Sequence, residues 1–163
     1  MGAVTPIPSS RVINKFAWVE PWLARGAQPT LRGYTWLADS GFKVVVNVRT
    51  HDETKSVKKA APILEPIHIP VMNNQAPSDA QALQWLELCA SQYMRPLFIH
   101  CNLGEGRTSA FCALVRLAQG WPLDEAIEEQ LPFGFDPEAE HREQARFLHA
   151  FVRKGLAEDV WIG

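Results

Sequence analysis

The segment from Pro96 to Gln119 constrains the fold more than any other part of the chain. It begins with the apolar run PLFIH, passes through CNLGEG and continues as RTSAFCALVRLAQ. A short apolar run that stops at turn residues is typical of a buried strand, and the apolar residues of the last part recur at helical spacing. The sequence therefore predicts a strand, a tight glycine-containing loop and a helix in direct succession.

Strands and helices alternate along the remaining chain. Strands are expected within FAWVEPWLARGA, where Pro21 separates two short ones, in the β-branched run FKVVVNVR and in PIHIPV. Helices are expected from Pro29–Thr30 to Gly41, in ETKSVKKAA, from the N-cap Ser78 to about Met94, from Trp121 over a short stretch, and from Asp136–Pro137 to Lys154. This alternation predicts an α/β fold whose central, largely parallel sheet is flanked by helices, with ligands bound beyond the carboxyl ends of the strands.

Length and composition indicate a single domain that spans residues 1–163. Of the 163 residues, 47% are hydrophobic, and the formal net charge of -2 gives no reason to expect binding to nucleic acid or to an acidic membrane. Three cysteines provide no disulfide framework, MGAVTPIPSS lacks the pattern of a signal peptide, and no apolar run approaches the ~18 residues that cross a bilayer. We therefore expect a soluble, cytoplasmic protein, unless a leader has been removed.

The loop of residues 101–107, which we call the phosphate loop, combines residue types that suit phosphate binding. Gly104 and Gly106 allow the backbone to curl so that peptide N–H groups face inward, and the N–H groups at the start of the following helix have no partner within it. Arg107 adds a permanent charge and two parallel N–H donors that match a pair of phosphate oxygens. The same positive field favours the thiolate of Cys101, which is the nucleophilic form of a cysteine.

Two neighbours of the phosphate loop support this hypothesis. The hydroxyl of Thr108 is placed to donate to the sulfur as it leaves phosphorus. The ring of His100 can orient the loop through hydrogen bonds, although stacking in the core is an equal interpretation of this histidine. The alternative to a phosphate site is a buried cysteine beside an ordinary glycine turn, and the combination of strand, flexible loop, Arg-Thr pair and helix favours the phosphate site.

The phosphate loop resembles the signature of the protein tyrosine phosphatase superfamily, His-Cys-x5-Arg-Ser/Thr, which HCNLGEGRTS matches from His100 to Thr108. The short chain is similar to the dual-specificity branch, and LARGAQPTLRGYTWLADSGFKVVVNVR resembles the opening of compact bacterial members, whose Arg-x-x-Gln-Pro segment corresponds to residues 25–29. The loop and its flanks are also similar to the protein-tyrosine-phosphatase-like phytases, which hydrolyse inositol polyphosphates. The resemblance covers most of residues 22–130 and implies a compact dual-specificity-phosphatase-like fold.

The resemblance implies a role for each residue of the phosphate loop. Cys101 is expected to form a phosphocysteine intermediate, Arg107 to bind phosphate in the ground and transition states, and Thr108 to assist breakdown of the intermediate. The backbone of the intervening residues is expected to complete a cradle for phosphate or sulfate: Asn102, Leu103, Gly104, Glu105 and Gly106. Neither His51–Asp52 nor His100–Cys101 has the partner spacing of a zinc site, and the family uses no metal, so no metal or other cofactor is expected.

The family also uses a general acid, usually an Asp about thirty residues before the nucleophile, to protonate the departing oxygen. Here that position falls on VMNNQAPSD, where residues 72–74, Met-Asn-Asn, cannot serve as acids. Asp79 is the nearest carboxyl group and is our assignment, although a carboxylate in the first turn of a helix is also stabilised there by the helix dipole. Asp52, Glu53 or the absence of a dedicated acid are the alternatives.

Two features of the sequence make opposite predictions about the substrate. Glu105 places a carboxylate inside the phosphate loop, where relatives that favour highly anionic head groups often carry Lys, and so counts against a polyphosphorylated substrate. Lys55, Lys58 and Lys59 cluster after the strand at residues 42–49 and form either a basic rim or a solvated helix face. The sequence leaves both possibilities open.

The remaining cysteines and histidines are expected to be structural. Cys89 and Cys112 fall within apolar helical patterns and are interpreted as core residues. His141 and His149 are expected on an exposed, charged helix face, because glutamates surround them in the sequence.

The sequence thus predicts a cysteine-dependent phosphomonoester phosphatase that acts through a phosphocysteine intermediate. Inositol polyphosphates or another small phosphorylated metabolite are the favoured substrates, and phosphotyrosine or phosphoserine peptides are the alternative. A phosphate-binding module that has lost efficient catalysis is the rival from another class, because asparagines occupy the acid position. A rhodanese-type sulfurtransferase also presents a loop cysteine, but Arg107 suits phosphate better.

Overall fold

The computed structural model of this protein describes residues 12–163. The prediction that MGAVTPIPSS is not a leader concerns residues that lie outside this range. Within the described residues, no helix is both long enough and apolar enough to cross a bilayer.

The described chain forms two compact units. The first holds a sheet and two helices and comprises the residues up to Pro70 together with Tyr93–Gly104. The second is helical and comprises Val71–Gln92 and Glu105–Gly163. The chain therefore passes from the first unit to the second within the phosphate loop, after Gly104. A single functional domain over residues 1–163 stays a prediction.

The first unit is built around a five-stranded sheet in the order β1-β2-β5-β3-β4. Its strands are β1 (Ala17–Glu20), β2 (Leu23–Gly26), β3 (Val44–Asn47), β4 (Glu65–His68) and β5 (Leu97–His100). Only β1 runs antiparallel to its neighbour, so the sheet is largely parallel, which confirms the predicted fold class. All four residues of β3 are buried, as the β-branched run in its sequence predicted.

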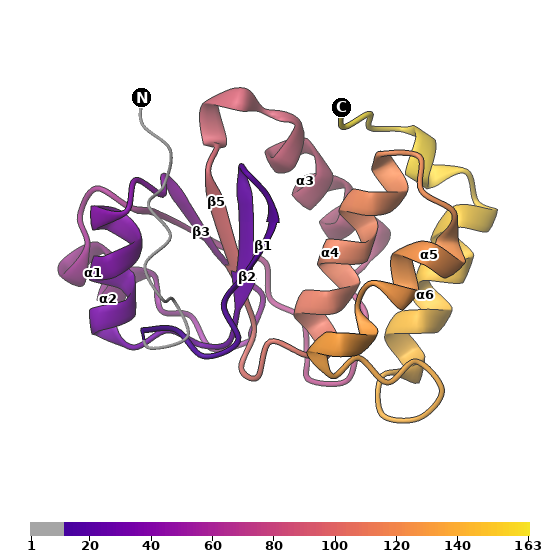
Figure 1. The fold of residues 1–163 in the computed structure, drawn as a ribbon, viewed down its shortest axis with the longest axis horizontal. Helices are drawn as coiled ribbons and strands as arrows, with labels where there is room; N and C mark the ends of the chain where they lie inside the picture. Colours follow the sequence, from indigo (N-terminus) through magenta and orange to yellow (C-terminus); the bar gives the residue numbers. More distant parts are fainter. Residues whose placement is uncertain (1–11) are drawn as a thin grey trace. The chain divides into compact units, whose positions relative to one another are not determined.

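Helices α1 (Leu31–Asp39) and α2 (Thr54–Ala60) lie side by side next to this sheet (Figure 1). Helix α1 begins where the sequence predicts, because the hydroxyl of Thr30 accepts a hydrogen bond from the N–H of Gly33 as an N-cap. It ends before Gly41, whose φ of 94° is a left-handed conformation that favours glycine.

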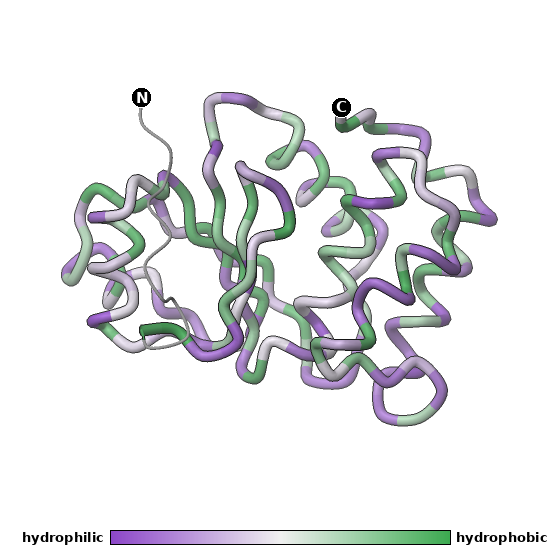
Figure 2. The backbone as a smooth tube through the Cα atoms, in the orientation of Figure 1, coloured by the Kyte–Doolittle hydropathy of each residue, from purple (hydrophilic) through white to green (hydrophobic). Residues whose placement is uncertain are grey.

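An aromatic cluster packs against the core of the first unit, and Phe16 is at its centre. The ring of Phe16 meets Trp36 edge to face at a centroid distance of 5.4 Å and stacks on Phe98 at 5.9 Å. Trp18 and Phe42 complete the cluster. Each aromatic pair contributes about 0.5–1.5 kcal/mol beyond the burial of its surface. Hydrophobic residues also follow the central strands, as the colouring of Figure 2 shows, and β5 is buried along its whole length up to the phosphate loop.

The second unit is built around helix α4, because every residue of α4 is buried and the other three α-helices of this unit pack against it (Figure 1). The helices are α3 (Asp79–Ala90), α4 (Gly106–Ala118), α5 (Leu123–Glu128) and α6 (Arg142–Arg153). The indole N–H of Trp85 in α3 donates to the carbonyl of Phe111 in α4 at 2.8 Å, and the two rings meet edge to face. Cys89 and Cys112 are buried in these helices, as predicted.

Helix α3 starts as predicted and ends earlier. The hydroxyl of Ser78 accepts the N–H of Gln81 at 3.1 Å, and the side chain of Gln81 accepts the N–H of Ser78 at 3.0 Å, which together form a capping box. The predicted continuation to Met94 is wrong, because the backbone of Ser91 is extended and the helix ends at Ala90.

The predicted start of α6 is also wrong. The helix begins at Arg142 rather than at Asp136, because the carbonyl of Asp136 accepts the N–H groups of Ala139 and His141 and so closes a separate turn before the helix. His141 is buried at the end of this turn, whereas the sequence predicted it on an exposed face. His149 is exposed on α6, as predicted.

Replacing Ser78 with Ala removes one half of the capping box. We expect the free energy of unfolding to fall by about 1 kcal/mol, which is the usual effect of losing an N-cap, and Ser78→Asp to restore most of it. Urea unfolding followed by circular dichroism measures this difference, with Ser56→Ala at an exposed position of α2 as the matched control. An equal loss in both alanine variants would contradict the capping role.

Candidate active site

The carboxyl ends of the parallel strands of the first unit form one row. Gly26, His100, Asn47 and His68 are cross-strand neighbours at the ends of β2, β5, β3 and β4. Cys101 follows β5 directly, so the phosphate loop starts at the edge of the sheet where α/β proteins bind ligands.

Two carbonyl groups of the phosphate loop are held by residues at the end of β2. The backbone N–H of Gln28 donates to the carbonyl of Asn102 at 2.9 Å, and Nη2 of Arg25 donates to the carbonyl of Gly104 at 3.0 Å. In a trans peptide group the N–H points opposite to the C=O. The N–H groups of these two peptides therefore face away from Arg25 and Gln28, which is the arrangement of an anion-binding nest.

The sulfur of Cys101 lies inside this arrangement. The N–H of Gly104 donates to Sγ of Cys101 at 3.2 Å, and Nδ1 of the His100 ring lies 3.0 Å from the carbonyl oxygen of Cys101. Only 3% of Cys101 is exposed, but its sulfur contacts a polar N–H group and not only apolar side chains. A backbone donor therefore faces the atom that the sequence predicts to be the nucleophile.

Residue 104 has to be a glycine for two reasons, its backbone conformation and the closeness of neighbouring atoms. Its φ of 74° is left-handed, and a Cβ atom at this position would lie 2.9 Å from the carbonyl carbon and oxygen of Gly26. Because these contacts are with backbone, a side chain here would displace the loop from β2.

Glu53, one of the alternative acids, belongs to a hydrogen-bond network that supports the phosphate loop. Its Oε2 accepts the Tyr34 hydroxyl and Nε2 of Gln28, both at 2.7 Å, and Oε1 of Gln28 accepts Nη1 of Arg49 at 2.7 Å. The hydroxyl of Tyr34 also lies 3.4 Å from Nε2 of His100. Burial, and then the hydrogen bond and negative charge of Glu53, raise the pKa of Tyr34, so this phenol stays protonated.

Asp52, another alternative acid, lies just before α2 and is hydrogen-bonded to the first residue of that helix. Its Oδ1 accepts the hydroxyl of Thr54 at 2.6 Å and the N–H of Thr54 at 2.9 Å, and these two bonds lower the pKa of the exposed Asp52 carboxyl. The ionised form is thus favoured, which is opposite to what a proton donor at neutral pH requires.

The second half of the phosphate loop leads into α4 in the second unit. Nη1 of Arg107 donates to the carbonyl of Val71 at 2.9 Å, and the guanidinium is largely buried. The carboxyl group of Glu105 lies against Gly134, where a Cβ atom would be 3.0 Å from Cδ of the glutamate. The hydroxyl of Thr108 is buried and has no hydrogen-bond partner within the described residues. A hydroxyl without a partner is free to donate to the sulfur of Cys101, which is the role that the sequence predicts for Thr108.

His141, which the sequence did not single out as functional, supports the start of α4. Its Nδ1 accepts the N–H of Asp136 at 2.8 Å, and its ring stacks on Phe135 with 2° between the planes. A Cβ atom on Gly106 would lie 2.5 Å from Cδ2 of His141, so the ring packs directly against the backbone of the phosphate loop. Glycine is therefore required at residue 106 for a tertiary contact.

The segment before α3, where the family places its acid, carries no carboxylate between Val71 and Ser78. Hydrogen bonds from two side chains of the second unit hold the backbone of this segment in place. Arg107 binds the carbonyl of Val71, and Nε2 of the buried Gln144 in α6 donates to the carbonyl of Gln75 at 2.9 Å. Gln144 is the second functional candidate that sequence reasoning missed, because nothing in the helical pattern of α6 indicates its partner.

Asp79, the acid assigned from the sequence, is the first residue of α3. Its Oδ2 accepts Nζ of Lys154 at 2.9 Å, and about half of each side chain is exposed, at 40% for Asp79 and 54% for Lys154. An exposed ion pair of this kind contributes about 0–1 kcal/mol, so the carboxyl group can leave its partner at little cost.

The chain is similar to known phosphatases. The family model of PTP-NADK, described as a DSP-PTPase phosphatase fused to NAD+ kinase, matches residues 10–147. The dual specificity protein phosphatase TpbA of Pseudomonas aeruginosa is 29% identical over 140 residues, which cover 85% of this chain and 63% of TpbA. The chain thus spans less than two thirds of the length of this curated relative.

Solved structures agree with this similarity. A crystal structure of P. aeruginosa TpbA in complex with pTyr is 26% identical, with a TM-score of 0.74 and coverage of 94% of this chain and 92% of that chain. The core catalytic domain of the PP-IP phosphatase SIW14 from S. cerevisiae, in complex with citrate, has a TM-score of 0.68 at 18% identity and covers 90% of this chain and 96% of its own, which is a likeness of fold. The dual-specificity-phosphatase-like fold is confirmed.

The contact between Gly106 and His141 predicts strong coupling between two substitutions. Gly106→Ala alone should lower the free energy of unfolding by about 1–3 kcal/mol, because the added methyl group overpacks against the imidazole ring. In the Gly106→Ala/His141→Ala double variant the ring is gone, so the loss should be smaller than the sum of the two single losses by about 1 kcal/mol or more. Denaturant unfolding of the four proteins measures this cycle, and additive losses would show that the ring does not limit the loop.

Proposed function

This chain belongs to the PTP-NADK family of DSP-type phosphatases, and on that premise we propose that it is a cysteine-dependent phosphomonoester phosphatase. The observation that carries the proposal is the orientation of the phosphate loop. The carbonyls of Asn102 and Gly104 are bound from the side of β2, and the N–H of Gly104 faces the sulfur of Cys101. Peptide dipoles fixed in this way stabilise negative charge without reorganising during the reaction.

The proposed reaction has two steps. In the first, the thiolate of Cys101 forms a sulfur–phosphorus bond, the phosphorus–oxygen bond to the leaving group breaks, and the departing oxygen receives a proton from a general acid. In the second, a water oxygen bonds to phosphorus and gives a proton to the carboxylate left by the first step, which restores the acid, while the sulfur–phosphorus bond breaks and inorganic phosphate and the thiolate are released. Arg107 and the amides of residues 102–106 hold the phosphoryl oxygens in both steps. The buried hydroxyl of Thr108 supports a role as donor to the departing sulfur.

Removing the nucleophile should abolish turnover. We expect Cys101→Ser to lower the kcat for p-nitrophenyl phosphate by at least about 10³-fold while phosphate still binds, and Arg107→Lys to weaken both binding and turnover. Cys89→Ala, at a buried cysteine of α3, is the matched control and should keep most of the activity. Steady-state kinetics and calorimetric titration with phosphate measure the two effects, and normal turnover by Cys101→Ser would refute the mechanism.

Asp79 is the proposed general acid. Asp79→Asn should lower the kcat by about 10²–10⁴-fold for an alkyl phosphate and less for p-nitrophenyl phosphate, whose leaving group needs little protonation. Lys154→Met removes the ion pair and keeps the carboxyl group, so it should leave both rates near those of the parent. If Asp79→Asn and Lys154→Met have the same effect on the kcat for both substrates, the carboxyl group of Asp79 is structural and the enzyme works without a dedicated acid.

Two substrate classes are proposed. Phosphotyrosine-type monoesters are supported by the relationship to TpbA, which is named a dual specificity protein phosphatase and whose structure holds pTyr, and by the carboxylate of Glu105 within the phosphate loop. Inositol polyphosphates and other small phosphorylated metabolites, which the sequence favoured, are supported by Lys55, Lys58 and Lys59, all exposed on α2. A panel of phosphopeptides, inositol phosphates and nucleotides compared by kcat/KM separates the two classes.

A phosphate-binding protein with little catalysis is the second candidate function, because residues 71–78 carry no carboxylate. A burst of one product per protein followed by almost no turnover would favour it over the phosphatase. A cytoplasmic location and the absence of nucleic-acid or membrane partners stay predictions.

A further inference from the structure

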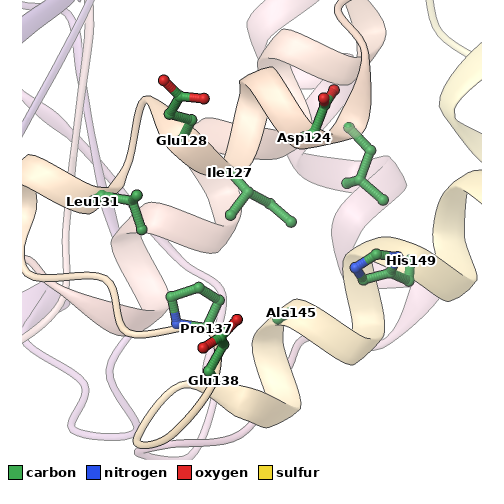
Figure 3. Close-up of a pocket in the computed structure, with 9 residues that line it drawn as sticks. Asp124, Ile127, Glu128, Leu131, Pro137, Glu138, Ala145 and His149 are labelled. Carbon is green, nitrogen blue, oxygen red and sulfur yellow. The ribbon is translucent and has the colours of Figure 1, made fainter.

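The second unit contains a pocket of about 730 Å³ that none of the proposed catalytic residues lines. It lies between α5 and α6, and Figure 3 shows Ile127 and Leu131 on one side and Pro137 and Ala145 on the other. The walls are therefore aliphatic, and Leu131 leaves 46% of its surface exposed. A volume in the range of ~300–1,000 Å³ with apolar walls is typical of a binding site.

Three exposed carboxylates surround these apolar walls: Asp124, Glu128 and Glu138. None of them forms an ion pair with a Lys, Arg or His among residues 12–163. The imidazole of His149 completes the edge of the pocket and is directed towards Ile127 (Figure 3).

Two acidic residues close to the pocket in the sequence are paired with arginines, unlike the three carboxylates of its rim. Glu129, the neighbour of Glu128, accepts hydrogen bonds from Arg116 at 2.8 and 2.9 Å. Glu143 in α6 is paired with Arg146 at 2.8 Å. The pocket thus combines uncovered apolar surface with uncompensated negative charge.

We propose that this pocket is a docking site for a basic, amphipathic segment of a partner protein. Such a segment places aliphatic side chains against Ile127 and Leu131 and sets Lys or Arg side chains opposite Glu128 and Glu138. The burial of the aliphatic side chains supplies most of the affinity, and the rim charges supply orientation and partner choice. An acidic peptide, nucleic acid or an anionic lipid surface would be repelled by the same carboxylates.

The proposal is independent of the chemistry of the phosphate loop. A phosphoryl group is anionic and is not recognised by a pocket with a negative rim, so this site selects a protein partner and not the reacting group. Because the rim is exposed, its contribution should fall as salt is added, whereas the aliphatic contacts should persist.

The test uses a fluorescein-labelled helical peptide made of leucine and arginine, arranged with one apolar face. Its two controls are a scrambled peptide of the same composition and a peptide with glutamate in place of arginine. Fluorescence anisotropy with the full chain should show saturable binding of the first peptide alone, weakened by added salt. No saturable binding, or equal binding of the scrambled peptide, would overturn the proposal.

Charge-reversal variants locate the site. Glu128→Lys/Glu138→Lys should raise the Kd by about tenfold or more, whereas Glu87→Lys/Glu158→Lys, the same charge change at exposed positions outside the pocket, should change it by less than about twofold. Leu131→Ser, at a half-exposed position, tests the apolar contact with little risk to folding and should also weaken binding. Turnover of p-nitrophenyl phosphate should be equal in all these variants.

Two results would assign the pocket to another occupant and overturn the proposal. The first is concentration-dependent self-association of the chain that Glu128→Lys/Glu138→Lys abolishes, since the partner would then be a second copy. The second is displacement of the peptide by dodecyltrimethylammonium at equal concentration, since any cationic amphiphile would then suffice.

Discussion

The hydrogen bonds from Arg25 and from the backbone of Gln28 decide which way the phosphate loop faces. They bind the carbonyls of Gly104 and Asn102 on the side of β2, and planar peptide geometry then directs the attached N–H groups the other way. Every chemical role proposed for the loop depends on this orientation. If these carbonyls turned inward instead, they would repel a phosphate oxygen at the position where the amides now attract it.

Arg25 is unusual because a strand buries its charged side chain almost completely, at 1% exposure. Burial of a guanidinium is costly unless hydrogen bonds replace its water, and the carbonyl of Gly104 provides one of them. The partner residue Gln28 is in turn fixed by Glu53, which also binds Tyr34. The Arg-x-x-Gln-Pro segment therefore works as a structural support for the phosphate loop, and the same support carries a positive charge in the unit that holds the nucleophile.

Local sequence patterns correctly predicted the helices and strands that position the site. They failed for residues whose position depends on tertiary contacts. The caps of α1 and α3 and the strand before Cys101 follow from residue types and spacing, so their prediction succeeded. The sequence shows Arg25 as a charged residue in an apolar run. It does not reveal the acceptor of Arg25, the carbonyl of Gly104, because that residue is distant in the chain. His141 was misplaced because its burial depends on a ring stack with Phe135 and on a turn that replaces the first part of the predicted helix.

The central claim, that the amides of the phosphate loop form an anion site, is tested most directly by NMR. Inorganic phosphate is titrated into the 15N-labelled Cys101→Ser variant, and the backbone amide resonances of residues 102–106 are followed. The orientation set by Arg25 and Gln28 predicts saturable downfield shifts of these amide protons at low phosphate concentration. Unchanged resonances in this segment, with phosphate binding elsewhere or nowhere, would contradict the account.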